Sequence, residues 1–138
     1  MPKILIVDDE PFIRQLLELT LEELEDEGVE LLFASNGDEA LEIIKKERPC
    51  LVFLDVMMPK KNGFEVCNIV KNELEMMDTY TVLLTAKGQE FDREKGREVR
   101  ADMYMTKPFN PDEVLAKARE ITGIIPISNQ GRNQGGEA

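Results

Sequence analysis

The sequence predicts one α/β domain built on a doubly wound, five-stranded parallel sheet of order 2-1-3-4-5. Short apolar runs without polar alternation recur along the chain, as expected of strands that are covered on both faces. Segments with helical periodicity and helix-start signals lie between these runs. A length of 138 residues suits a single domain. Right-handed crossovers leave few strand orders, and 2-1-3-4-5 is a common one at this size.

The expected strands are apolar on both faces, most clearly in the runs ILIV and LVFL. Val, Ile, Leu and Phe dominate them, as in strands buried between two helical layers. The five strands are expected at about Lys3–Asp8, Glu30–Ser35, Cys50–Asp55, Thr79–Thr85 and Asp102–Thr106.

Five flanking helices are expected to follow the five strands. Pro11 suits a first helical turn, and apolar residues then recur at helical spacing. Three other helices begin with an asparagine that precedes a glutamate by three residues, the pattern of a capping box. The periodic residues are Ile13, Leu17, Leu21 and Leu24, and the capping pairs are Asn36 with Glu39, Asn62 with Glu65, and Asn110 with Glu113.

The fourth helix, expected around Gln89–Glu98, has an unusual composition. Phe91 is its one large apolar residue, and Gly96 costs about 1 kcal/mol relative to alanine in a helix. A weakly docked, movable helix and an ordinary surface helix fit this composition equally well.

The composition of the chain changes after Gly123, where glycine and amide side chains dominate. Residues 1–123 are therefore expected to form the domain and 124–138 a flexible tail or linker.

Composition disfavours several classes of function. A net charge of -11 and a pI near 4.5 would repel nucleic-acid phosphates from this chain alone. No apolar run approaches the roughly 20 residues that span a membrane, and the N-terminus lacks the layout of a signal peptide. Cys50 and Cys67 are expected to be reduced residues of the core, with a disulfide as the less favoured alternative. These features predict a cytoplasmic protein without a membrane segment.

Five polar side chains lie at the carboxyl ends of four of the expected strands. Asp8 and Asp9 end the first strand, Asp55 ends the third, Thr85 ends the fourth and Lys107 follows the fifth. In the order 2-1-3-4-5, the carboxyl ends of strands one and three open together at the switch point. Three carboxylates at that point raise one another's pKa or bind a cation, and hard oxygen ligands favour Mg²⁺ or Mn²⁺. With a hydroxyl and an ammonium group added, the set suits phosphoryl transfer.

Each of these residues also has an ordinary structural interpretation. An Asp-Asp pair after a strand often caps a helix, and one aspartate there can be a turn residue. The hydroxyl of Thr85 could be bonded to the backbone, and Lys107 could be a solvated charge. Their conjunction at a single edge of the sheet favours a functional site over capping.

Four motifs in this order resemble the receiver domains of two-component response regulators. They are VDDE (7–10), FLDVMMPKKNG (53–63), LTAKG (84–88) and YMTKPF (104–109). The resemblance covers about residues 3–122 and implies that Asp55 accepts a phosphoryl group. It further implies a Mg²⁺ site whose ligands are Asp9, Asp55 and the backbone carbonyl of Met57, with Asp8 assisting through water.

The resemblance also implies a conformational switch. Thr85 and Lys107 would contact the phosphoryl group, and Tyr104 would turn inward when Thr85 moves toward it. The Lys107–Pro108 peptide would be cis. A downstream partner would bind the face formed by helix four, strand five and helix five. Such a protein catalyses its own phosphorylation and dephosphorylation but acts mainly as a signalling switch.

The phosphodonor must be another protein, because the chain contains no histidine. A histidine kinase or a phosphotransfer protein is therefore the expected partner. Met57 and Lys87 flank the expected path of an attacking water, and neither is an acid or amide that could orient it. Slow hydrolysis of the phosphoryl group is one interpretation, and two ordinary surface residues is the other.

Two positions depart from the usual family sequence. Arg100 replaces a glycine suited to a helix C-cap, so a positive φ there would be strained unless the cap is remodelled. Met103 replaces an acid that forms salt bridges across a dimer in transcription-factor members. Dimerisation of that type is therefore not expected, and an exposed Met103 would suit a different partner.

Other classes of function fit the sequence less well. A receiver-like adaptor that is never phosphorylated is the main alternative, although such members normally lose an acid or the lysine. A phosphatase of the haloacid dehalogenase type needs an acid two residues after its aspartate, where this chain has Met57. A flavin-binding domain would place Ser, Thr and Gly after the first strand, where DDEP would repel the phosphate.

Overall fold

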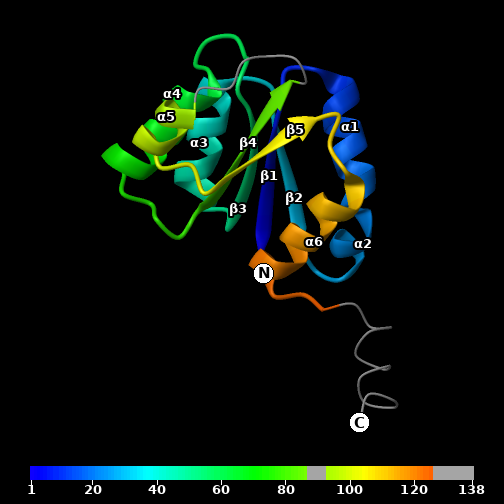
Figure 1. The fold of residues 1–138 in the computed structure, drawn as a ribbon. Coiled ribbons are helices and arrows are strands. Elements are labelled where there is room, and N and C mark those ends of the chain that lie inside the picture. Colours follow the sequence, from blue (N-terminus) through cyan, green and yellow to red (C-terminus); the bar gives the residue numbers. More distant parts are fainter. Residues whose placement is uncertain (87–92, 126–138) are drawn as a thin grey trace.

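A five-stranded parallel sheet forms the middle of three layers (Figure 1). The computed structural model describes residues 1–86 and 93–125. The sheet order is β2-β1-β3-β4-β5, with every neighbouring pair parallel, which confirms the predicted fold class. The strands are β1 (Lys3–Val7), β2 (Glu30–Ala34), β3 (Leu51–Asp55), β4 (Tyr80–Ala86) and β5 (Met103–Lys107).

The described helical segments form the five predicted regions. The first region is interrupted at Leu21, where α1 gives way to α2, and the third ends in a π-helical segment, η1. In order along the chain they are α1 (Pro11–Thr20) with α2 (Glu22–Asp26), α3 (Gly37–Glu47), α4 (Gly63–Asn68) with η1 (Ile69–Glu73), α5 (Arg93–Glu98) and α6 (Pro111–Thr122).

Two of the three predicted caps pair as the sequence pattern indicates. The side chains of Asn36 and Asn62 accept hydrogen bonds from the backbone N–H of the glutamate three residues on, and Asn62 forms a complete capping box. Asn110 instead accepts from the N–H of Asp112, two residues on. All three bonds satisfy N–H groups that a helix start leaves without an intrahelical partner.

Some sequence predictions lie outside the described residues. These are the first turn of the fourth predicted helix with Phe91, the residue Lys87, and residues 126–138 of the predicted tail. In the part of the chain that the structure describes, no helix is both long and apolar enough to cross a membrane.

The sheet buries a separate apolar core on each face. Successive residues of a strand point to opposite faces, so Ile4 and Ile6 of β1 pack in one cluster and Leu5 and Val7 in the other. One core lies beneath α1, α2 and α6, and the other beneath α3, α4 and η1 (Figure 1). Both cores hold the sheet rigid, and its carboxyl edge therefore provides a firm base for polar side chains.

A glycine lets α4 begin directly against the end of β3. A Cβ atom on Gly63 would lie 2.5 Å from the backbone oxygen of Asp55 and 2.9 Å from the Cα of Val56. Real Cβ atoms do not approach backbone atoms so closely, so any side chain here would displace the end of β3. Gly63 thus fixes the loop that follows Asp55.

Two backbone features expected from the sequence are present. Arg100, after α5, has a φ of 62°, so the predicted strained conformation occurs without glycine. The Lys107–Pro108 peptide bond is cis.

Cys50 and Cys67 are free thiols, half-buried and buried respectively, and no disulfide joins them.

Candidate functional site

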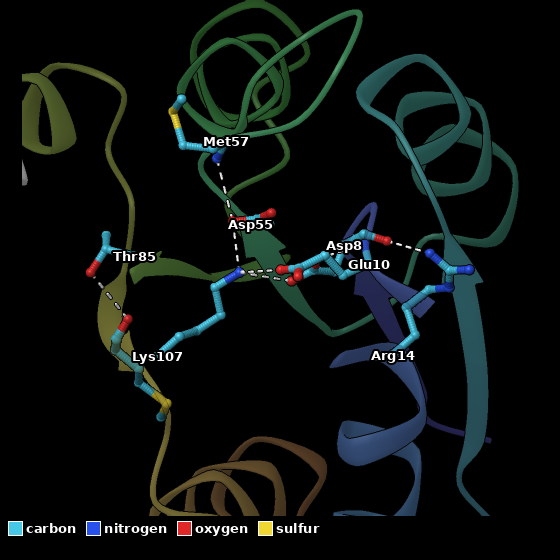
Figure 2. Close-up of polar contacts among 8 residues, drawn as sticks. Asp8, Glu10, Arg14, Asp55, Met57, Thr85 and Lys107 are labelled. Carbon is cyan, nitrogen blue, oxygen red and sulfur yellow. Dashed lines mark hydrogen bonds and ion pairs between the residues drawn. The ribbon is translucent and has the colours of Figure 1, made fainter. Parts of the chain in front are cut away.

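Three strand ends bring a lysine between two buried carboxylates (Figure 2). Asp8 follows β1 directly, Asp55 is the last residue of β3, and Lys107 is the last residue of β5. The Nζ of Lys107 lies 3.1 Å from Oδ2 of Asp8 and 3.2 Å from Oδ1 of Asp55. The predicted convergence of these groups at one edge of the sheet is therefore observed.

Asp9 completes a cluster of three acids beside this lysine. One carboxylate oxygen from each of Asp8, Asp9 and Asp55 lies within 4.8 Å of the other two. Asp8 and Asp55 are buried, whereas Asp9 is exposed to solvent. An all-oxygen donor set with one side open to water fits a hard divalent cation that keeps several waters. The residues present could therefore hold a metal ion.

The two charged groups at the centre have perturbed proton affinities. Burial, together with the neighbouring Asp8 carboxylate, raises the pKa of Asp55 from 3.8 to about 6, against the opposing effect of Lys107. Burial lowers the pKa of Lys107, but the charges of Asp55 and Asp8 outweigh it, and the net pKa lies above 10.5. Lys107 therefore remains positive, and Asp55 carries unfavourable negative charge near neutral pH.

The loop after β3 places the backbone of Met57 next to Asp55. The N–H of Met57 donates a hydrogen bond to Oδ1 of Asp55 at 3.3 Å. Its side chain points away from Asp55 (Figure 2), and the residue is 60% exposed. The role predicted for the Met57 carbonyl as a metal ligand stays a prediction.

Thr85 and Tyr104 are the two residues predicted to switch. Thr85 is 7% exposed, and its hydroxyl lies 3.5 Å from the carbonyl oxygen of Met105, at the limit of a hydrogen bond. Figure 2 shows Thr85 on the same edge as Asp55 and Lys107. Tyr104, on β5, is 42% exposed. In this structure, then, Thr85 is directed to the backbone of β5 and Tyr104 to the surface.

Two contacts at the site were not predicted from the sequence. Glu10 lies 3.8 Å from Nζ of Lys107, and Nη1 of Arg14 donates to the backbone oxygen of Asp8 at 2.6 Å. The sequence does carry a signal for Arg14: it is a cation one turn into the helix that follows an acidic strand end. The prediction was limited to residues at the strand ends themselves and therefore did not include Arg14.

Comparison of the chain with known proteins shows a match to one protein family. Residues 4–119 match the family described as the response regulator receiver domain. The chain is 46% identical over 136 residues to ycf27 of Porphyra purpurea, described as a probable transcriptional regulator. It is 46% identical over 119 residues to the alkaline phosphatase synthesis transcriptional regulatory protein PhoP of Bacillus subtilis. These alignments cover 94% and 86% of this chain.

A solved structure shows the same likeness in three dimensions. The chemotaxis protein CheY4 of Vibrio cholerae superposes with a TM-score of 0.74 at 34% identity, covering 88% of this chain and 98% of that one. By contrast, the alignments cover 54% of ycf27 and 48% of PhoP. The chain thus spans about half the length of the transcriptional regulators that it matches.

Proposed function

The chain belongs to the response regulator receiver domains of two-component systems, and we propose that it is a phosphorylation switch whose acceptor is Asp55. The observation that carries this proposal is the placement of Asp55, buried between Lys107 and the acidic pair Asp8–Asp9. Burial and the Asp8 carboxylate together outweigh the favourable charge of Lys107, so this placement of Asp55 costs stability at neutral pH. Its position is explained by a reaction that uses its charge.

The proposed reaction is direct transfer from a phosphohistidine to Asp55. A carboxylate oxygen of Asp55 attacks phosphorus, the new P–O bond forms as the P–N bond breaks, and the released imidazole nitrogen keeps the electron pair and takes up a proton. Lys107, already 3.2 Å from Asp55, neutralises charge on the phosphoryl oxygens. Thr85 contacts the same oxygens once its hydroxyl leaves Met105.

Mg²⁺ is the proposed cofactor, with Mn²⁺ as a possible substitute. The ligands would come from the carboxylates of Asp8, Asp9 and Asp55 and from the backbone carbonyl of Met57. When bound, the ion supplies neutralising charge for the acids and the incoming phosphoryl oxygens. Its binding would also favour the ionised form of Asp55, whose pKa is raised by burial.

The proposed phosphodonor is a histidine kinase or a phosphotransfer protein. The chain has no histidine, so it cannot carry a phosphohistidine of its own. The receiver supplies the acceptor, the cation site and the lysine, while the partner supplies the activated phosphoryl group. Cytoplasmic location is proposed on the same basis, since the donor groups of such systems face the cytoplasm.

The proposed output is a change of the face formed by α5, β5 and α6. Thr85 lies near the end of β4, beside β5, and Tyr104 lies on β5 and is 42% exposed. Movement of Thr85 toward a phosphoryl group would free space into which Tyr104 can turn. Two populations then differ at the surface a partner reads.

The effector is proposed to lie outside residues 1–123. Relatives that are transcriptional regulators are about twice as long as the matched segment, while CheY4 is covered almost completely. The charge of -11 opposes direct binding of nucleic acid by this chain. Residues 124–138 would then serve as a tail or as the start of a linker.

Intact-protein mass spectrometry tests the proposal. Incubation with Mg²⁺ and a small phosphodonor such as acetyl phosphate should add one phosphoryl group. The gain should be absent in Asp55→Asn and after removal of divalent ions by EDTA. If the wild-type protein gains no mass while a known receiver in the same buffer does, the chain is an adaptor that is never phosphorylated.

A further inference from the structure

The backbone oxygen of Asp8 is bound by a side chain from the next helix. Arg14, one turn into α1, reaches back so that its Nη1 lies 2.6 Å from this oxygen (Figure 2). The arginine is half-buried between α1 and the end of β2, where it lines a hollow with Phe33 and Ser35. The family match and the proposed chemistry leave this contact without a role.

The contact completes the immobilisation of Asp8. Its N–H donates to the oxygen of Ala34 at 3.2 Å, Oδ1 accepts from the N–H of Glu10 at 2.9 Å, and Oδ2 accepts from Lys107 at 3.1 Å. Arg14 holds the one remaining polar atom, the carbonyl oxygen. Any rotation of the Asp8 backbone or side chain would therefore break at least one of these four hydrogen bonds.

Asp9 depends on this immobilisation more than Asp8 does. Its carboxylate is exposed, and among the described residues none donates a hydrogen bond to it. Its direction is set by the backbone, first of all by the Asp8–Asp9 peptide. The carbonyl that Arg14 holds belongs to that peptide, so Arg14 fixes the plane from which the Asp9 side chain projects.

We propose that Arg14 is a positioning residue, which presets Asp9 for the cation by holding the Asp8–Asp9 peptide. This inference rests on the proposed Mg²⁺ site. Groups that orient metal ligands through hydrogen bonds typically contribute 10- to 100-fold to metal affinity. Preorganisation supplies the gain, because the ligand oxygen does not have to be ordered when the ion binds.

The charge of Arg14 predicts the opposite effect on binding. A guanidinium near three carboxylates repels a divalent cation, so removing it should tighten Mg²⁺ binding if charge alone matters. Removing the positioning bond should weaken binding. The sign of the change therefore separates the two roles without reference to any absolute affinity.

Calorimetric titration of the unphosphorylated full chain with MgCl₂ tests the proposal. Arg14→Met keeps the helix-forming aliphatic stem but loses the donor, and should raise the Kd for Mg²⁺ about tenfold. Arg14→Lys retains one donor and should restore most of the affinity. Lys61→Met is the matched control, because it removes a partly exposed cation whose ion-pair partner among the described residues is Asp38, and it should leave the Kd unchanged or slightly lower.

Equal or tighter Mg²⁺ binding by Arg14→Met overturns the proposal. Failure of the wild-type protein to bind Mg²⁺ overturns the proposed cation site as well, and is thereby distinguished from a failure of Arg14 alone. Amide hydrogen exchange gives a readout that does not depend on the ion. The Asp9 and Glu10 amides should exchange faster in Arg14→Met while the α3 amides do not, and unchanged exchange at Asp9 counts against the inference.

Discussion

At the scale of single residues, the site is organised around charge that the fold does not neutralise by itself. Asp8 and Asp55 are both buried and share one cation, Lys107. Burial and Asp8 together raise the pKa of Asp55 to about 6. The metal-free protein is therefore destabilised at neutral pH by the group that its function requires.

The pH dependence of stability follows from this shift. An unfolded aspartate titrates near pH 3.8 and native Asp55 near pH 6, so between these values the native state binds more protons and its stability falls as pH rises. Asp55→Asn removes the buried charge, and Lys107 keeps Asp8 as its partner. In EDTA at pH 7, this variant should therefore be about 2 kcal/mol more stable than the wild-type protein. Urea unfolding should show the gain disappearing near pH 4. A less stable Asp55→Asn at pH 7 would contradict this account.

A second prediction at this scale concerns the lifetime of the phosphoryl group. The exposed side chain of Met57 cannot orient an attacking water, so the wild-type phosphoryl group should persist well beyond seconds. Met57→Asn, which adds an amide two residues past the acceptor, should shorten the lifetime severalfold. Met57→Leu, of similar size and polarity, should not. Decay of the added mass after removal of the phosphodonor measures all three.

At the scale of elements, an ion pair between a buried lysine and a partly exposed aspartate joins η1 to the start of β5. The Nζ of Lys71 lies 2.7 Å from Oδ2 of Asp102 and 2.6 Å from the oxygen of Thr79. Asp102 also accepts from the N–H of Thr81 on β4 at 2.8 Å. The π-helical geometry of η1 brings Lys71 to this position at the amino ends of the strands. The pair therefore anchors the amino end of β5, which belongs to the face proposed to switch.

The two halves of this pair should differ in their effect on stability. The Lys71 side chain is 2% exposed, whereas that of Asp102 is 30% exposed. Asp102→Asn strands a buried ammonium and should cost about 3 kcal/mol. Lys71→Met leaves a carboxylate that water and Thr81 can still solvate, and should cost about 1 kcal/mol. Chemical denaturation at pH 7 gives both values, and the reverse order would refute this interpretation.

The end of α5 carries a strain that glycine would relieve. Arg100 has a φ of 62°, a conformation that costs a residue with a Cβ atom about 1 kcal/mol. Arg100→Gly should therefore stabilise the protein by about that amount. Arg100→Ala keeps the Cβ atom and serves as the control, with little expected gain. If thermal unfolding shows Arg100→Gly to be less stable, the side chain itself contributes to the native state.

At the scale of the whole molecule, the sequence predicted what depends on periodicity and topology. Apolar runs on both faces predict the parallel sheet, and the strand order predicts that Asp8, Asp55 and Lys107 lie at one edge of it. Contacts made by long side chains across elements were not predictable in this way. Arg14 and Lys71 look like ordinary helical cations in the sequence, because their partners are a backbone carbonyl and a distant aspartate.

Helix irregularities were also beyond the sequence. The break at Leu21 and the π-helical segment after Asn68 depend on how each helix packs against the sheet, and helix propensity does not encode them. The same holds for Asn110, whose cap bond goes to Asp112. These differences do not alter the carboxyl edge of the sheet. The site residues were therefore predicted to lie together correctly, although the helices differ in detail from the prediction.

Chemical trapping of the phosphorylated residue tests the central claim most directly. The chain is treated with Mg²⁺ and acetyl phosphate, reduced with sodium borohydride, digested and sequenced by mass spectrometry. Borohydride reduces an acyl phosphate to an alcohol, so a phosphorylated aspartate is recovered as homoserine. The account predicts homoserine at position 55 and at no other aspartate. Homoserine at position 8 or 9, or its absence from a sample that had gained a phosphoryl group, would contradict it.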